Sequence, residues 1–203
     1  MSYPICRDLQ QQDRIFEGVL CRAATTVKLS ISRDPQLAAA EIVSGTYFST
    51  LGVGPFLGRV IGTGDGQTPG ASPVVVLSYD FWKTQLAGAP DAVGRTVLIN
   101  QHPMTVVGVA APGFRGVDVG EVPAVWIPAS VAGQAVPGFT KLLDRRTPWM
   151  QILGRLAPTV TLAQARAGLQ PWFKAMLEED TRRAVFPVVT VEQRKTFWPQ
   201  RSS

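Results

Sequence analysis

The residues that could perform nucleophilic chemistry in this chain are two serines and one histidine. Ser44 and Ser78 each follow an apolar run, and His102 is the only histidine. A serine hydrolase needs a nucleophile, a base and an orienting acid within hydrogen-bonding distance. Neither serine lies in a G-x-S-x-G motif, and His102 lies in a predicted turn with no carboxylate or serine at a recognisable spacing. The pattern favours structural roles for these residues and predicts a protein that is not an enzyme.

Carboxylates and metal ligands give no stronger signal. Glu178, Glu179 and Asp180 are adjacent at the end of a predicted helix. Acid–base catalysis by two carboxylates needs surroundings that move their pKa values apart, and a solvated helix end provides none. The sequence has no C-x-x-C pair and no cluster of cysteine with histidine, which excludes a structural zinc site. We therefore expect no metal and no cofactor.

Cys6 and Cys21 are the only cysteines, and the sequence leaves two alternatives for them. A disulfide between them would close a short loop and would stabilise the fold by about 3 kcal/mol in an oxidising compartment. Otherwise they are two small buried thiols. The sequence favours the thiols but does not decide between the two.

A glycine-rich stretch, residues 62–70, is a candidate phosphate-binding loop. Backbone N–H groups of such a loop hold phosphate when the loop joins a strand to the N-terminus of a helix. Here a strand, Val74–Leu77, follows, and no Lys-Ser or Lys-Thr pair completes a Walker A motif. The stretch therefore favours a flexible surface loop, and we expect the chain neither to bind nor to hydrolyse ATP.

Composition and charge limit the class of protein. The chain has 203 residues, of which 45% are hydrophobic and 17% charged, which is typical of a globular protein. The net charge is +5, but basic residues are scattered and do not alternate with stacking aromatics, so we expect no nucleic-acid partner. No window of about 18 apolar residues is present, and the first residues lack the apolar core of a signal peptide. The chain is either cytosolic or a soluble piece of a larger protein.

Hydrophobic periodicity predicts short elements separated by glycine and proline. The predicted helices are residues 8–18, 45–51, 79–86, and a longer helix that begins at a Thr161–Gln164 capping box and is kinked or divided at Pro171. The predicted strands are residues 19–32, 37–44, 74–77, 95–99, 104–109, 122–127, 150–156 and 185–191. Residues 37–44 could equally be helical, and Trp126 is expected to be half buried. The turn of the hairpin formed by residues 95–109 is expected at 100–103. Residues 131–146 are predicted to be a long loop.

Five segments in a fixed order resemble a known family. The first is Val43-Ser-Gly-Thr-Tyr-Phe-Ser-Thr-Leu-Gly-Val with Leu57-Gly-Arg59. The others are residues 74–82, residues 93–100 with 105–109, residues 113–116 with 125–128, and residues 155–169. Together they resemble the MacB-like periplasmic core domain of FtsX-type ABC transporter permeases, over residues 3–191, and the opening residues are similar to the orphan permeases of soil bacteria. The chain has Asn100-Gln101 where this family usually has Asn-Gly.

The resemblance implies an α+β architecture in two parts. Residues 1–44 and 140–203 would form a discontinuous porter-like α+β subdomain. Residues 45–139 would form an inserted, mostly-β subdomain of the Sabre type. Because the resemblance places this domain between membrane helices, we expect a soluble fragment of a membrane protein at the periplasmic, extracytoplasmic face.

The resemblance also implies a function and partners. The chain would be the extracytoplasmic domain of an ABC-type permease, relaying conformational change to export or extrude a substrate, with a hinge near Ser44 and 136–140. Partners would be flanking transmembrane helices, a separate cytoplasmic ABC ATPase, and a second copy of the chain or a periplasmic adaptor. The alternative is a free-standing extracytoplasmic module that binds a ligand or a protein. No substrate or partner contact residue is predicted.

Overall fold

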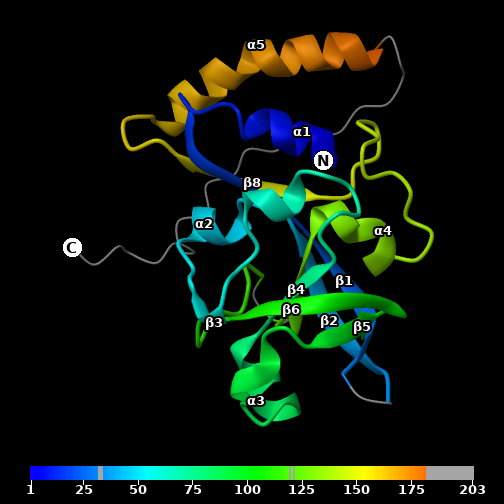
Figure 1. Cartoon of the computed structure of the whole chain (residues 1–203). Coiled ribbons are helices and arrows are strands. Elements are labelled where there is room, and N and C mark those ends of the chain that lie inside the picture. The colour runs from blue at the N-terminus through cyan, green and yellow to red at the C-terminus, as the bar shows by residue number, and fades with distance from the viewer. Residues whose placement is uncertain (32–33, 119, 121, 182–203) are drawn as a thin grey trace.

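The structure, a computed structural model, describes residues 1–31, 34–118, 120 and 122–181, and it is α+β, as predicted. Its helices are α1 (Tyr3–Leu9), α2 (Tyr47–Leu51), α3 (Tyr79–Gln85), α4 (Ala132–Ala135) and α5 (Leu162–Thr181). Its strands are β1 (Phe16–Ser30), β2 (Gln36–Val43), β3 (Pro55–Gly58), β4 (Val74–Leu77), β5 (Thr96–Ile99), β6 (His102–Ala110), β7 (Val125–Pro128) and β8 (Gln151–Leu156). Figure 1 shows α1 and α5 at one end of the molecule, α3 at the other, and the strands between them.

The strands form one sheet that closes on itself. Their pairing runs β2-β7-β4-β6-β5-β1, and β1 pairs again with β2, so six strands complete a ring. The β1–β2 ladder is antiparallel from Arg22 opposite Val43 to Leu29 opposite Gln36, while β1 meets β5 only at Leu29 and Ser30. β8 extends the N-terminal half of β1, and β3 pairs with β6. Because each of the six strands has a neighbour on both sides, the ring has no edge strand with a full row of unpaired backbone N–H and C=O groups.

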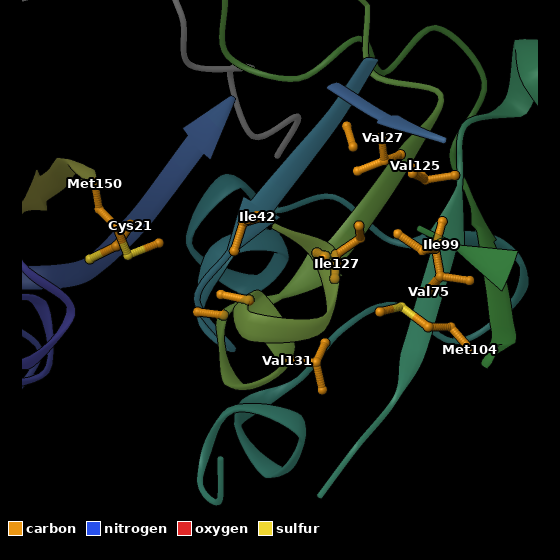
Figure 2. Close-up of a cluster of buried hydrophobic side chains, with 14 of the residues drawn as sticks. Cys21, Val27, Ile42, Val75, Ile99, Met104, Val125, Ile127, Val131 and Met150 are labelled. Atoms are coloured by element: carbon orange, nitrogen blue, oxygen red, sulfur yellow. The ribbon is translucent and has the colours of Figure 1, made fainter. Parts of the chain in front are cut away.

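The interior of the ring is filled with aliphatic side chains. Because side chains alternate along a strand, every second residue points inward. The inward residues belong to one buried cluster: Val27, Leu29, Ala38, Ala40, Ile42, Val75, Leu77, Val97, Ile99, Met104, Val106, Val125 and Ile127. Figure 2 shows Val27, Val75, Ile99, Val125 and Ile127 facing one another across this space.

The outward side chains of the same strands form a second cluster. Leu20, Val43, Val76 and Trp126 pack against Tyr47, Phe48 and Leu51 of α2. Trp126 is fully buried, so the prediction of a half-buried residue is wrong: β7 is covered on both faces. Two hydrophobic layers therefore share one set of strands, and a shift of a strand disturbs both.

The N-terminal helix lies earlier than predicted. A helix at residues 8–18 is wrong: α1 covers Tyr3–Leu9 and begins with a proline in its first turn, a position that proline favours. Tyr3, Ile5, Cys6 and Leu9 are its buried residues. β1 then begins at Phe16, inside the range predicted to be helical.

Residues 37–44 resolve to a strand, β2, because β1 and β7 pair with both of its edges. The predicted hairpin of β5 and β6 is confirmed, but its turn is shorter than expected. His102 and Pro103 already pair with Ile99 and Leu98, so only Asn100 and Gln101 form the loop. Both have positive φ (48° and 71°), as a two-residue type I′ turn requires, and Asn100 is a residue that tolerates this conformation.

Two predicted loops contain ordered structure. Residues 62–70 are not a free surface loop, because a 3₁₀ turn, η1 (Thr63–Gly66), is tied to the rest of the molecule by hydrogen bonds from Tyr3 and Ser130. Residues 131–146 include α4 and the end of a second turn, η3 (Ala129–Val131), whose residues are buried.

The long C-terminal helix is continuous through Pro171, so the predicted alternative of a division there is wrong, and the kink stays a prediction. Its capping box is confirmed: the Gln164 N–H donates to Thr161 Oγ1 at 3.2 Å and the Thr161 N–H donates to Gln164 Oε1 at 2.8 Å. Leu169 and Met176, on either side of the proline, are both buried, and this packing holds both halves on one face. The predicted strand at 185–191 lies outside the described residues.

Within the described residues, no helix combines the length and apolar character needed to cross a membrane. The sheet draws strands from both predicted subdomains, since β1, β2 and β8 lie in the first range and β3 to β7 in the second. The division into 1–44 with 140–203 and 45–139 stays a prediction.

Two glycines permit the close approach of β3 to β6. A Cβ atom at Gly108 would overlap the carbonyl oxygen of Arg59 and lie 2.7 Å from that of Leu57. Gly58 has φ of 67° and its added Cβ would meet the carbonyl oxygen of Val107. The Leu57-Gly-Arg59 segment therefore crosses β6 backbone to backbone.

We predict that Gly108→Ala lowers the free energy of unfolding by about 2–3 kcal/mol, because the added methyl group meets backbone that cannot rotate away. Urea denaturation followed by circular dichroism measures the change. Gly54→Ala is the matched control: its φ is not in the left-handed region and nothing lies within 4 Å of the added Cβ, so its change should stay within about 0.5 kcal/mol. Equal stability of the two variants would contradict this packing.

Candidate functional site

A buried arginine and a buried glutamate lie on the outer face of the strand ring. The strand registers bring them together: Arg22 on β1 is opposite Val43 and Glu41 on β2 is opposite Ala24, so the two are diagonal neighbours. Diagonal positions are within reach of long side chains. Arg22 is 3% exposed and Glu41 is 1% exposed.

The carboxylate of Glu41 is held by three donors from three elements. Its Oε1 accepts from Arg22 Nε, and its Oε2 accepts from Tyr47 OH at 2.8 Å and from Trp126 Nε1 at 2.8 Å. Tyr47 lies on α2, and Trp126 is the residue of β7 opposite Glu41. Since charge-assisted hydrogen bonds are strong and directional, this one group fixes β1, β2, α2 and β7 relative to each other.

The far end of the Arg22 guanidinium contacts two further segments. Nη1 donates to Gln151 Oε1 on β8 at 2.7 Å and lies 2.7 Å from Asp118 Oδ2 in the segment between β6 and β7. Asp118 is 46% exposed, so this pair is at the surface end of the network. The network thus runs from a fully buried carboxylate to one that water reaches.

Burial dominates the electrostatics of Glu41. It raises the pKa of the Glu41 carboxyl above its ordinary value of 4.5, and the charge of Arg22 with the three hydrogen bonds offsets only part of that effect. Burial and the neighbouring Glu41 charge also raise the pKa of Tyr47, so its hydroxyl stays a donor. Burial alone would lower the pKa of Arg22, but Glu41 and Asp118 outweigh it and keep the guanidinium charged.

Beside this network a small cleft opens on the molecular surface. It is lined by Arg22, Ala24, Ala39, Ala40, Glu41, Arg115, Val117, Asp118 and Pro123. No group of three or more His, Cys, Asp or Glu side chains in the described part of the chain could hold a metal ion.

A second ion pair organises the segment after β3. Asp65 accepts two hydrogen bonds from Arg59, at 2.6 and 2.9 Å, and one from the Gly62 N–H at 2.9 Å. Burial acts to raise the pKa of Asp65, but these donors hold it below its usual value. The pair folds the glycine-rich stretch back on itself, which gives Arg59 of the Leu57-Gly-Arg59 segment a structural role.

Three contacts hold the N-terminal segment, one to the ring and two to segments beside it. Cys6 on α1 and Cys21 on β1 form a disulfide with Cα atoms 6.2 Å apart, so the expectation of two thiols is wrong. The Met1 carbonyl oxygen accepts from the N–H groups of Trp149 and Met150 at 3.0 and 2.8 Å. The Tyr3 hydroxyl donates to the Gly66 carbonyl at 3.0 Å. A displacement of α1 is therefore passed to β1, β8 and η1 together.

The three residues considered for nucleophilic chemistry have separate structural roles. Ser78 is the N-cap of α3 and accepts from the Phe81 N–H at 3.2 Å. Ser44 Oγ accepts from the Cys21 N–H at 3.0 Å and contacts Thr46 Oγ1. His102 is exposed at the start of β6. Among the described contacts none joins His102 to either serine, so these three residues do not form a catalytic triad with one another.

Sequence reasoning missed Arg22 and Glu41. The available signal was a charged residue within each of two strand-forming runs, Val19–Val27 and Ala38–Val43. Alternation alone would place Glu41 and Ile42 on opposite faces of the strand. The partners of Glu41, Tyr47 and Trp126, come close to it only in the folded chain. No local pattern identifies them.

Comparisons with known proteins give one family and a shared fold. Residues 7–171 match the family model of the MacB-like periplasmic core domain. Among solved structures, the periplasmic region of MacB from Actinobacillus actinomycetemcomitans is similar, with a TM-score of 0.67 and 17% identity over 92% of this chain and 85% of that chain. A domain of a protein described as a permease from Porphyromonas gingivalis is similar with a TM-score of 0.56 and 12% identity, over 89% of this chain and 70% of that one. No curated protein matches the sequence.

We predict that the stability of the protein depends on pH through Glu41 with a definite sign. Because the folded state raises this pKa, it binds the proton more tightly than the unfolded state, so the Glu41 contribution falls as pH rises from 4.5 through the higher folded value. The measurement is the free energy of unfolding, from urea denaturation at pH 4 to 8, for the natural chain and Glu41→Gln. The difference, natural chain minus variant, should decrease with pH. An increase would mean that Arg22 outweighs burial.

Proposed function

Since this chain belongs to the MacB-like periplasmic core domain family, we propose that it is the extracytoplasmic domain of an ABC-type transporter permease that relays conformational change to export a substrate. A separate cytoplasmic ATPase drives the change, and membrane helices flanking the domain transmit it. The family match over residues 7–171 carries this proposal. The similarity of fold to the periplasmic region of MacB supports it.

The disulfide supports the extracytoplasmic location. Disulfides persist in oxidising compartments such as the periplasm and are rare in the cytosol. Both cysteines are fully buried and join α1 to the N-terminal half of β1. The bond fixes the first helix to the ring, which is where a domain driven by a preceding membrane helix needs a stiff connection.

The buried ion-pair network supports a relay. Arg22, Glu41 and Gln151 lie in the ranges 1–44 and 140–203, while Tyr47, Trp126 and Asp118 lie in 45–139. The network therefore joins the two proposed subdomains through directional bonds. Such contacts have few alternative geometries, so they transmit a displacement instead of absorbing it.

We predict that Cys6 and Cys21 are oxidised in cells that express the full permease. Alkylation with a mass-tagged maleimide, before and after reduction, measures free thiols. The natural protein should gain no tag before reduction and two after it, because the bond forms in an oxidising compartment. Cys21→Ser is the control, since it frees Cys6 and should gain one tag without reduction when denatured. Two tags before reduction would contradict the extracytoplasmic location.

We also predict that the segment between α4 and β8, which lies outside the strand ring and carries Leu143, moves relative to the ring when the ATPase binds ATP. Spin labels at Leu98→Cys and Leu143→Cys, both exposed positions, report the distance between them in the full permease with its ATPase subunit. Electron–electron resonance should show a shift on the order of 5 Å between nucleotide-free and ATP-bound states. A pair within one part, Phe56→Cys with Leu98→Cys, should stay constant. An unchanged Leu98–Leu143 distance would contradict the relay.

A further inference from the structure

The loop between α4 and β8 carries an exposed leucine among basic residues. Leu143 is 57% exposed. Lys141, Arg145 and Arg146 lie within three residues of it, and all three are exposed. Asp144 is the one acidic residue in the stretch 140–148, so three basic residues face a single acidic one. An apolar side chain surrounded by basic ones is typical of a surface that contacts a membrane interface.

Two consecutive turns give this loop a fixed shape. The Asp144 N–H donates to the Lys141 carbonyl oxygen at 3.2 Å, and the Thr147 N–H donates to the Asp144 carbonyl oxygen at 3.4 Å. The Asp144 carboxylate closes the second turn, since it accepts from the Arg146 N–H and from the Thr147 hydroxyl, both at 2.9 Å. Such bonds from an aspartate to its own backbone two residues on are a common way to stabilise a turn. The acidic residue therefore has a structural role in the loop.

The turns separate one leucine from the other. Leu142 packs against the aliphatic cluster of the ring, whereas its neighbour Leu143 stays exposed. In the second turn, Arg145 Nη2 lies 2.7 Å from Asp8 Oδ2 on α1, and this pair is partly exposed. The loop is thus attached to the domain by Leu142 and Arg145, while Leu143 remains on the surface.

The base of the loop lies beside the N-terminus. The rings of Phe139 and Trp149 pack with their centroids 4.7 Å apart, so the two ends of the loop meet. The Met1 carbonyl oxygen accepts from the Trp149 and Met150 N–H groups, and the Met1 amino group donates to the Met150 carbonyl oxygen at 2.6 Å. Figure 1 shows the loop in yellow-green next to the N-terminus. In the proposed permease, a membrane helix reaches the domain at this point.

The surface of an anionic bilayer matches both features of the loop. Its phosphate groups complement the basic side chains, whose long aliphatic stems let the charged ends stay at the headgroups. The boundary between headgroups and acyl chains removes an exposed leucine from water. A soluble anion would neutralise Lys141 and Arg146 but would leave Leu143 in water. The combination therefore favours a lipid surface.

We propose that residues 140–148 form a membrane-contact loop, in which Leu143 enters the interface of an anionic bilayer while Lys141 and Arg146 bind its phosphate groups. The inference deepens the proposed function and rests on it in one respect: the preceding membrane helix is what brings Met1, and with it the loop, to the bilayer. A loop held at the bilayer gives the strand ring a fixed point against which it moves.

The test is co-sedimentation of the chain with vesicles of phosphatidylglycerol mixed with phosphatidylcholine, and with vesicles of phosphatidylcholine alone. The natural chain should bind the anionic vesicles more tightly, and salt at about 0.5 M should remove most of this binding by screening. The double variant Lys141→Gln with Arg146→Gln should weaken binding about 25-fold, because each basic residue near an anionic surface contributes about fivefold. Leu143→Ser should weaken it about fivefold. All three residues are exposed, so both variants should fold.

Arg95→Gln with Arg115→Gln is the matched control, because it removes two exposed basic residues outside the loop with the same change in net charge. It should leave vesicle binding within about twofold of the natural chain. A loss of binding equal to that of the Lys141 and Arg146 variant would mean non-specific attraction and would overturn the proposal.

A fluorophore that responds to polarity measures insertion directly. Attached to Leu143→Cys, it should shift to shorter wavelength when anionic vesicles are added, while the native cysteines stay in their disulfide. Attached to Leu37→Cys, at an exposed leucine that starts the ladder with β1, it should not shift. Equal shifts at both positions, or none at either, would overturn the proposal.

Two further outcomes separate this proposal from others. If the chain sediments as a dimer without vesicles and Leu143→Ser makes it a monomer, the loop is an interface between copies and the membrane contact is wrong. The vesicle assay contains no ATPase, so a failure to bind would reject the membrane-contact loop and leave the relay standing. An unchanged spin-label distance in the full permease, with vesicle binding intact, would reject the relay alone.

Discussion

The structure depends on how one carboxylate, that of Glu41, is satisfied away from water. Removing an ion pair from solvent is unfavourable, and the loss is recovered only when every oxygen has a well-placed donor. Arg22, Tyr47 and Trp126 supply those donors from β1, α2 and β7. The same pairs fix the register of the strands, because a slip of one residue would turn Glu41 into the aliphatic interior. Stability and strand register therefore rest on the same set of bonds.

The closed ring explains why such a network can link distant parts of the chain. Its strands carry an aliphatic layer inside and an aromatic layer outside, so they cannot move independently. The N-terminal helix is bound to this unit by the Cys6–Cys21 disulfide and by the backbone of Met1. A domain built in this way passes on a displacement at one end, which is the property that the proposed role in a permease requires.

Local patterns predicted the elements whose signals are local. The apolar run Val74–Leu77, the Ser78 cap of α3 and the Thr161 capping box are examples, since each depends on residues within one or two turns. The ring and the Arg22–Glu41 pair were not predicted, and the disulfide was left as one of two alternatives, because each depends on the register between segments that are separate in sequence. A division of the last helix at Pro171 was wrong because buried residues on both sides of the proline hold α5 together. A helix at 8–18 was wrong because its helical period is weak and α1 begins earlier, with a proline in its first turn.

Hydrogen exchange at individual amides tests most directly whether Glu41 joins β1, β2 and β7 into one unit. In the natural chain the amides of Cys21, Ile42 and Trp126 should exchange only through a common opening, with the same free energy. In Glu41→Ala all three should lose protection by equal amounts. If the amide of Trp126 alone became faster while those of Cys21 and Ile42 kept their protection, the carboxylate would be a local bond of β7, and the account of a shared anchor would be wrong.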